Sequence, residues 1–161
     1  MEPEKVLYQG YAVSFQEVPD EVSVVFSIAG CDKHCPGCHS PHLWAKEGKP
    51  LEKDFKYVLA KYKNYATCVC FMGDGGDINA LRPFIVYAWG QGFKTCLYTG
   101  EDDAKAVPFS SMLFLDYLKL GHYDEKLGGL DIPNTNQAMY KISWPDNAPV
   151  FQKVSFVKPQ I

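Results

Sequence analysis

Three cysteines near the start of the chain are the residues best suited to do chemistry. Cys31, Cys35 and Cys38 follow a C-x3-C-x2-C spacing, in a segment that also contains Pro36 and Gly37. Three soft thiolates on one tight loop suit an iron–sulfur cluster, which prefers cysteine sulfur. A [4Fe-4S] cluster has four irons, so three protein ligands leave one iron free to bind another molecule.

Two other interpretations of these cysteines stay open. A structural zinc site usually has four ligands, often two C-x2-C pairs, and the second pair is missing here. His34 or His39 could complete a Cys3His site, although both lie inside or against the same short loop, where the geometry would be strained. The three residues could also be ordinary free thiols, which fits their clustering poorly.

The elements expected around these cysteines alternate between strand and helix. Apolar runs predict strands at 22–28, 67–72, 95–98, 112–118, 139–142 and 150–157, and an extended or hairpin segment at 6–18. Apolar residues at helical spacing predict helices at 52–62 and 79–89, with a short helical piece at 102–106. This order indicates βαβ units and a parallel sheet. Ligands of such sheets bind at the carboxyl ends of the strands.

Three of the expected strands end in loops that suit ligand binding. The cysteine loop follows the first, Gly75-Gly76-Asp77 follows the second, and Thr99-Gly100 follows the third. Glycine lacks a Cβ, so its backbone can approach a ligand closely. Because Gly73-Asp74 precedes the glycine pair, the motif could be shifted by two residues. A loop of this composition is also common in simple turns, but the shared edge predicts one common site.

Composition and charge narrow the classes of protein. The chain has 161 residues and a net charge of −3, which favours a single domain over 1–161 and gives no basic face for nucleic acid. No apolar run approaches the length of a membrane span, and Met1–Lys5 lacks the features of a signal peptide, so a cytoplasmic location is expected. The other cysteines, Cys68, Cys70 and Cys96, lie in strand-like runs and are expected to pack as small buried residues.

The cysteine motif resembles that of the radical S-adenosylmethionine (radical SAM) enzymes. The string from Ala29 to His39, with Trp44 soon after, is similar to that of the activating proteins of anaerobic ribonucleotide reductase. Gly37 stands where most radical SAM families have an aromatic residue, and it looks like the Pro-Gly of those activators. By the same resemblance, His39 is the candidate for contact with the adenine of SAM. Gly37 and Cys38, which directly precede it, are expected to border the same SAM site.

Three more segments resemble the same family. Gly75-Gly76-Asp77 is similar to the Gly-Gly-Glu/Asp segment that meets the amino end of SAM, although Ile78 stands where the family has proline. Thr99-Gly100 looks like the Thr-Gly that would meet the ribose or carboxylate of SAM. The segment with Asn136 and Gln137 resembles a Ser-Ser-Asn-Gln segment, to which no role beyond turn formation or partner contact is assigned.

The resemblance implies a complete function. The fold would be α/β, a shortened, open radical-SAM-type (β/α) partial barrel with a mainly parallel sheet. The cofactors would be a [4Fe-4S] cluster and SAM. The partner would be the glycyl radical subunit of anaerobic ribonucleoside-triphosphate reductase, with flavodoxin or ferredoxin as electron donor. The alternatives are an activase for another glycyl radical enzyme and, from a different class, a zinc-stabilised binding module without catalysis.

Overall fold

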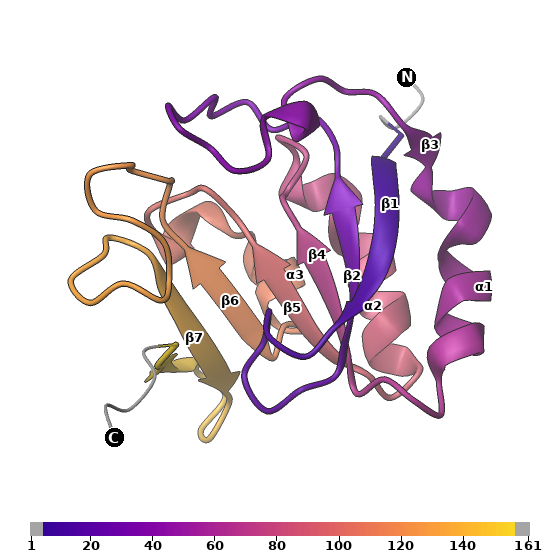
Figure 1. Ribbon diagram of the computed structural model, residues 1–161. Coiled ribbons are helices and arrows are strands. Elements are labelled where there is room, and N and C mark those ends of the chain that lie inside the picture. Colours follow the sequence, from indigo (N-terminus) through magenta and orange to yellow (C-terminus); the bar gives the residue numbers. More distant parts are fainter. Residues whose placement is uncertain (1–4, 157–161) are drawn as a thin grey trace.

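The computed structural model describes residues 5–156, which build one open sheet of eight strands. The strands are β1 (Leu7–Ser14), β2 (Ser23–Ile28), β3 (Lys49–Pro50), β4 (Cys68–Met72), β5 (Lys94–Tyr98), β6 (Tyr117–Leu120), β7 (Ala138–Ser143) and β8 (Val150–Val154). The helices are α1 (Leu51–Tyr62), α2 (Ile78–Gly90) and α3 (Phe109–Met112), with 3-10 turns at Pro41–Leu43 and Ala104–Ala106. All three helices lie on one side of the sheet (Figure 1).

The sheet is mixed rather than mainly parallel. Its order is β3-β1-β2-β4-β5-β6-β7-β8, and the central strands β2, β4, β5 and β6 run parallel. The flanking strands pair antiparallel, β1 with β2 and β3 on one side and β7 with β6 and β8 on the other. The expected parallel sheet is therefore found only in the centre, where helical crossovers connect the strands. The expectation that the sheet stays open is confirmed.

Most of the predicted elements are present, with one clear error. The stretch 112–118 is not a strand, because α3 ends at Met112 and the strand β6 begins only at Tyr117. Met112 and Leu115 are both buried, at the spacing of a helical turn that packs against the core. For the segment 6–18, the extended alternative is confirmed: Leu7–Ser14 form the single strand β1, whose register with β2 shifts between Tyr8 and Gly10.

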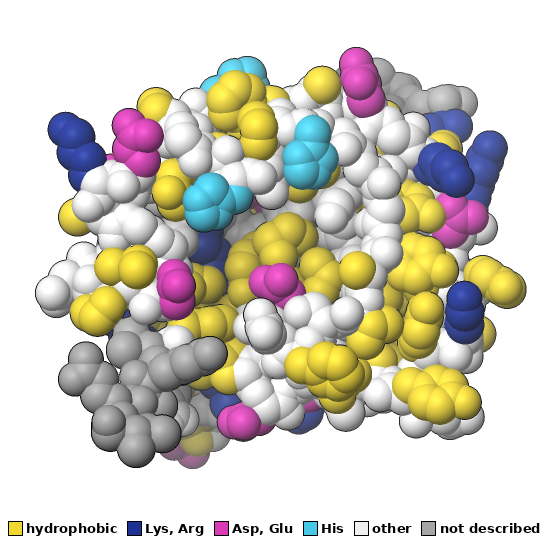
Figure 2. Space-filling view, in the orientation of Figure 1, with side chains coloured by type: hydrophobic (Ala, Val, Ile, Leu, Met, Phe, Trp, Pro, Cys, Tyr) yellow, Lys and Arg dark blue, Asp and Glu magenta, His cyan; other side chains and the backbone are white. Residues whose placement is uncertain are grey.

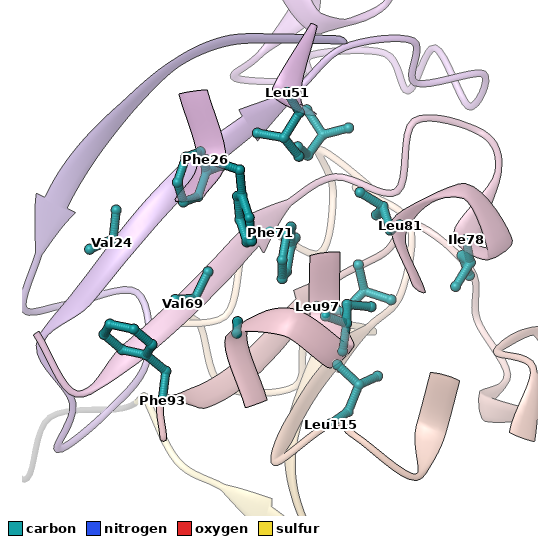
Figure 3. Packing of buried hydrophobic residues seen from close by; sticks show 14 of the residues in the cluster. Val24, Phe26, Leu51, Val69, Phe71, Ile78, Leu81, Phe93, Leu97 and Leu115 are labelled. Carbon is teal, nitrogen blue, oxygen red and sulfur yellow. The ribbon is translucent and has the colours of Figure 1, made fainter. Parts of the chain in front are cut away.

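The helix-covered face of the sheet carries the main core. Alternate residues of the central strands point to this side, and they include Phe26, Phe71 and Leu97 (Figure 3). Phe55 of α1 packs between the first two rings, with its centroid 5.1 Å from that of Phe26 and 5.8 Å from that of Phe71. Each buried side chain of this size contributes about 1.5–3 kcal/mol to stability. The parallel strands are thereby held firmly beneath the loops at their carboxyl ends.

Among residues 5–156, no helix lies over the opposite face of the sheet. A smaller apolar cluster lies there, formed by Val18, Val25, Cys68, Cys70, Cys96, Tyr117 and Met139. Viewed from this side, apolar side chains form the floor of a hollow, and histidines lie along its upper rim (Figure 2). The cysteine loop and the loop after β6 stand at the same end of the sheet (Figure 1).

Two expectations from the sequence fall wholly or partly on residues that are not described. Residues 1–4 of the segment used to exclude a signal peptide lie outside the described residues, as does residue 157 of the last expected strand. Within residues 5–156, no helix is long and apolar enough to cross a membrane.

Candidate functional site

The cysteine loop begins at the carboxyl end of β2, and hydrogen bonds close the loop at its base. The backbone amides of Gly30 and Cys31 both donate to the carbonyl of Leu43, at 2.8 and 2.9 Å. Leu43 is itself buried, so it fixes both ends of the loop to the body of the protein. Inside the loop, a turn is closed by the amide of Cys38, which donates to the carbonyl of Cys35. The three cysteines are thus held on one short, anchored segment.

The three thiols of this loop are free and half-buried. Burial raises the pKa of the Cys31 thiol, while backbone hydrogen bonds from Lys33 and His34 act in the opposite direction. The amide of Ser40 lies 3.4 Å from Sγ of Cys38. Backbone N–H groups that point at sulfur stabilise thiolates, and such hydrogen bonds are common around iron–sulfur clusters.

The described residues contain no ready-made site for a single metal ion. Among the described residues, no three His, Cys, Asp or Glu side chains lie close enough to hold one metal ion together. In a Cys3His zinc site all ligands must converge on one atom. Three thiols on one loop are the type of donor that an iron–sulfur cluster would take, and Cys31, Cys35 and Cys38 would hold it. His34 instead stacks on Trp44, with ring centroids 4.8 Å apart.

The glycine loop after β4 packs directly against the start of the cysteine loop. Gly75 has a φ of +66°, and a Cβ there would lie 3.2 Å from the carbonyl oxygen of Ala29. Gly76 has a φ of +77°, and its Cβ would lie 3.3 Å from the carbonyl oxygen of Gly30. Glycine is required at both positions because the backbone is left-handed and the neighbouring backbone is close. Each of the two loops therefore fixes the position of the other.

The two aspartates of the glycine loop have different environments. Asp77 is exposed and caps α2, with its carboxylate accepting from the amide of Ala80 at 3.4 Å. Asp74 is only 9% exposed. Its Oδ1 accepts from the amide of Gly76 at 2.8 Å, and its Oδ2 accepts from the hydroxyl of Thr99 at 2.5 Å. The carboxylate of Asp74 thus joins the ends of β4 and β5, whereas Asp77 caps the N-terminus of α2.

The end of β5 also contacts the cysteine loop. Gly100 lies under the side chain of Lys33, whose Cγ would be 3.0 Å from a Cβ at that position. Nζ of Lys33 forms an ion pair with Glu101 at 3.0 Å. The predicted strand ends at β2, β4 and β5 are therefore brought together at one edge, in agreement with the expectation from the sequence.

The loop after β6 lies on the other side of the cysteine loop. Gly37 faces Glu125, whose Oε2 would be 2.7 Å from an added Cβ, and the ring of His39 lies 5.1 Å from that of Tyr123. Asn136 donates to the carbonyl of His122 at 2.9 Å. Gln137 is buried, and its amide nitrogen lies 3.4 Å from the carbonyl oxygen of Gly121. Asn136 and Gln137 therefore hold the ends of this loop together, a role the sequence did not reveal.

One residue at this edge was missed from the sequence. Lys119 on β6 is buried, and Nζ donates to the carbonyl oxygens of Gly121 at 2.6 Å and of Thr99 at 3.4 Å. Burial lowers the pKa of Lys119 to about 8, against the partly compensating effect of neighbouring acidic groups. The available signal was a lysine within the apolar run Tyr117–Leu120, which resembles an ordinary half-exposed strand.

Comparison with known proteins adds little to this geometry. No family model matches the chain, and no curated protein is similar to it in sequence. Among solved structures, the chain is similar to the crystal structure of QueE from Escherichia coli, with 12% identity and a TM-score of 0.47. The match covers 70% of this chain and 68% of that chain. At this level of similarity, function must be inferred from the site itself.

Proposed function

We propose that this chain is a radical SAM activase that acts on anaerobic ribonucleoside-triphosphate reductase. The observation that carries the proposal is the cysteine loop, with three half-buried thiols at the carboxyl end of a parallel strand, packed against a glycine loop. Cys31, Cys35 and Cys38 are the proposed ligands of a [4Fe-4S] cluster. The sequence resemblance of this segment supports the choice of the reductase activators within the superfamily.

The edge of the sheet offers distinct groups for SAM. When bound, the cluster supplies the electron for reductive cleavage of SAM. The left-handed backbone at Gly75 and Gly76, beside the cysteine loop, suits the amino end of the ligand. The Asp74–Thr99 hydrogen bond fixes the neighbouring strand end, and Thr99-Gly100 there is the proposed contact for the ribose or carboxylate once the Lys33 side chain over Gly100 moves aside. His39 is exposed beside Tyr123 and is the proposed adenine contact.

The open face of the sheet supports a macromolecular substrate. The helices cover only the opposite side, and the hollow on the open face has an apolar floor below the cysteine loop (Figures 1 and 2). A substrate protein that inserts its own segment would exclude water from this hollow, which a reactive radical requires. We therefore propose the glycyl radical subunit of the reductase as partner, with flavodoxin or ferredoxin as electron donor.

Anaerobic reconstitution tests this function directly. The protein is loaded with iron and sulfide, reduced chemically and mixed with SAM, and methionine release is measured. Addition of the anaerobic reductase should then give a doublet glycyl radical signal in electron paramagnetic resonance, and a reductase with its radical-site glycine replaced by alanine should give none. SAM cleavage without any radical on the wild-type reductase would point to another partner. A colourless protein that retains zinc would instead favour the binding module.

A further inference from the structure

The outer edge of β1 carries backbone hydrogen-bonding groups that no described strand takes up. On its inner side, β1 pairs with β2 as far as Ser14, whereas on its outer side β3 pairs with Leu7 and Tyr8 only. Among residues 5–156, no strand pairs with the outer side of Gly10–Ser14. An open hollow of about 620 Å³, lined by residues 8–11 and 47–49, lies beside the start of this stretch. Unpaired N–H and C=O groups on an edge strand form a template for another strand.

This edge lacks the side chains by which sheet edges usually repel other strands. From Val6 to Gln16 the sequence contains neither a charged residue nor a proline, the two kinds of residue that most often protect an edge. Tyr11 is 36% exposed and Val13 is 40% exposed, although both lie on a strand. Apolar side chains gather over β1 and α1, on the right of Figure 2. The free part of β1 is therefore both unpaired and apolar.

The free stretch of β1 is complementary to itself when it is turned around. Tyr11 pairs in register with Phe26, which belongs to the core beneath the helices. Because side chains alternate along a strand, Tyr11 and Val13 share the helix-covered face, and the three small residues around them lie on the open face. A two-fold axis through Ala12 would place Tyr11 of one copy opposite Val13 of the other. Pairs of an aromatic and a β-branched residue are among the favourable cross-strand pairs.

We propose that the edge of β1 is a dimer interface, in which the stretch Gly10–Ser14 of two copies of this chain pairs antiparallel around a two-fold axis at Ala12. The inference goes beyond the proposed function and does not depend on it. The pairing joins two sheets edge to edge, so it leaves the open face of each copy free.

The length of the free stretch supports a second copy as the occupant. With Ala12 opposite Ala12, the first residue of each free stretch lies opposite the last residue of the other. The strand β1 ends at Ser14, and Val18 is already buried in the apolar cluster of the open face. Each chain therefore leaves the edge before it would meet Lys49 of β3 on the other copy. Such a symmetric interface uses both free edges at once and stops at two chains.

The test is sedimentation equilibrium of the full chain at micromolar concentrations, with a thiol reductant present so that no disulfide links two copies. The wild type should approach twice the 18.1 kDa mass of one chain. Ala12→Lys and Ala12→Glu should each weaken the dimer at least about tenfold, because the axis places two like charges directly opposite each other. An equimolar mixture of the two variants should recover the dimer, since lysine on one copy then faces glutamate on the other. Ala12 is exposed, so both variants should fold, and either one alone tests the interface.

Val150→Lys is the matched control, because Val150 is 49% exposed on β8, the strand at the other edge of the sheet. This variant should keep the dimer. A wild type that stays monomeric would overturn the inference and leave the edge of β1 to an extended segment of another protein. The inference is also wrong if the charged Ala12 variants dimerise as the wild type does, if their mixture stays monomeric, or if Val150→Lys alone dissociates the dimer. A protein that dimerises in this way but forms no [4Fe-4S] cluster would remove the proposed function and leave this inference in place.

Discussion

Three cysteines lie beyond the carboxyl edge of the central strands, and three more lie within those strands. Cys31, Cys35 and Cys38 are half-buried on a loop that is held by its own backbone. Cys68 and Cys70 of β4 and Cys96 of β5 are completely buried in the apolar cluster of the open face. The two sets have the same side chain and the same number of thiols, so any difference in chemistry comes from their surroundings.

The surroundings differ in what they offer to a negative charge. Burial raises the pKa of the Cys68 and Cys96 thiols far above the ordinary value, which keeps them protonated and unreactive. The cysteine loop is less buried, and backbone amides point at its sulfurs. The buried ammonium of Lys119 lies at the end of β6, where it donates to the carbonyls of Thr99 and Gly121. The interior therefore disfavours thiolates strongly, whereas at the edge burial also raises the pKa of Cys31 but is opposed by backbone hydrogen bonds from Lys33 and His34.

The largest predicted effect comes from exchanging cysteines in the two sets for alanine. Cys31→Ala, Cys35→Ala and Cys38→Ala should each reduce SAM cleavage to the background level, because each removes one proposed ligand of the proposed cluster. Cys68→Ala and Cys96→Ala should retain cleavage and the cluster spectrum while losing about 1–2 kcal/mol of stability, from a small cavity in the core. Methionine release and urea denaturation measure the two effects.

This comparison fails in either of two ways. Full cleavage in a loop variant would remove that cysteine from the ligand set. Loss of the cluster in Cys68→Ala or Cys96→Ala, with the fold intact by circular dichroism, would show that the interior thiols take part in the chemistry.

The sequence predicted the elements that hold the site better than the contacts inside it. The strand and helix at 22–28 and 52–62 were found because their apolar residues repeat with a clear period. The strand expected at 112–118 was wrong, because a short apolar run does not distinguish a short buried helix from a buried strand. The antiparallel partners of the sheet depend on long-range pairing, which no local pattern encodes.

Contacts between loops were the hardest to predict. The spacing of the cysteines identified one loop, but only the structure shows that Asp74, and not Asp77, is bonded to Thr99. The choice between these aspartates depends on which of them is free of the helix cap, a property of the folded backbone. Lys119 was overlooked for a similar reason, because its burial depends on the loop after β6.

A smaller effect is expected when each of the two aspartates of the glycine loop is replaced by alanine. Asp74→Ala leaves the buried hydroxyl of Thr99 and the partly buried amide of Gly76 without their acceptor, so it should cost about 2–3 kcal/mol of stability and weaken SAM binding at least tenfold, which is about 1.4 kcal/mol. Asp77→Ala removes only a helix cap, worth about 1 kcal/mol, and should weaken SAM binding less. Calorimetric titration of the reconstituted proteins with SAM gives the affinities. A larger loss of affinity in Asp77→Ala would place the ligand contact at Asp77 and contradict the role assigned to Asp74.

The smallest predicted effect concerns the stability of the cluster-free protein. At the edge of the sheet, burial of the charged Lys119 should lower the free energy of unfolding. The pKa of Lys119 is lowered by burial to about 8, while an unfolded lysine titrates near 10.5. Between these values the unfolded chain binds more protons than the folded one, so this residue makes the free energy of unfolding rise with pH across that window. Below pH 8 the lysine is charged in both states, and the folded protein bears the full cost of its burial.

Replacement of Lys119 by methionine removes that cost and keeps an apolar chain of similar length. After allowance for the lost hydrogen bonds, the free energy of unfolding at pH 7 should increase by about 1–2 kcal/mol, and the gain should shrink as the pH rises from 8 towards 10.5. Urea denaturation at pH 7 and pH 10 measures both values. Lys141→Met, at an exposed position of β7, is the control and should change stability by less than about 0.5 kcal/mol. A loss of stability in Lys119→Met at pH 7 would mean that the buried ammonium is well satisfied by its carbonyl partners. The buried charge at the edge of the sheet would then stabilise the fold, contrary to this prediction.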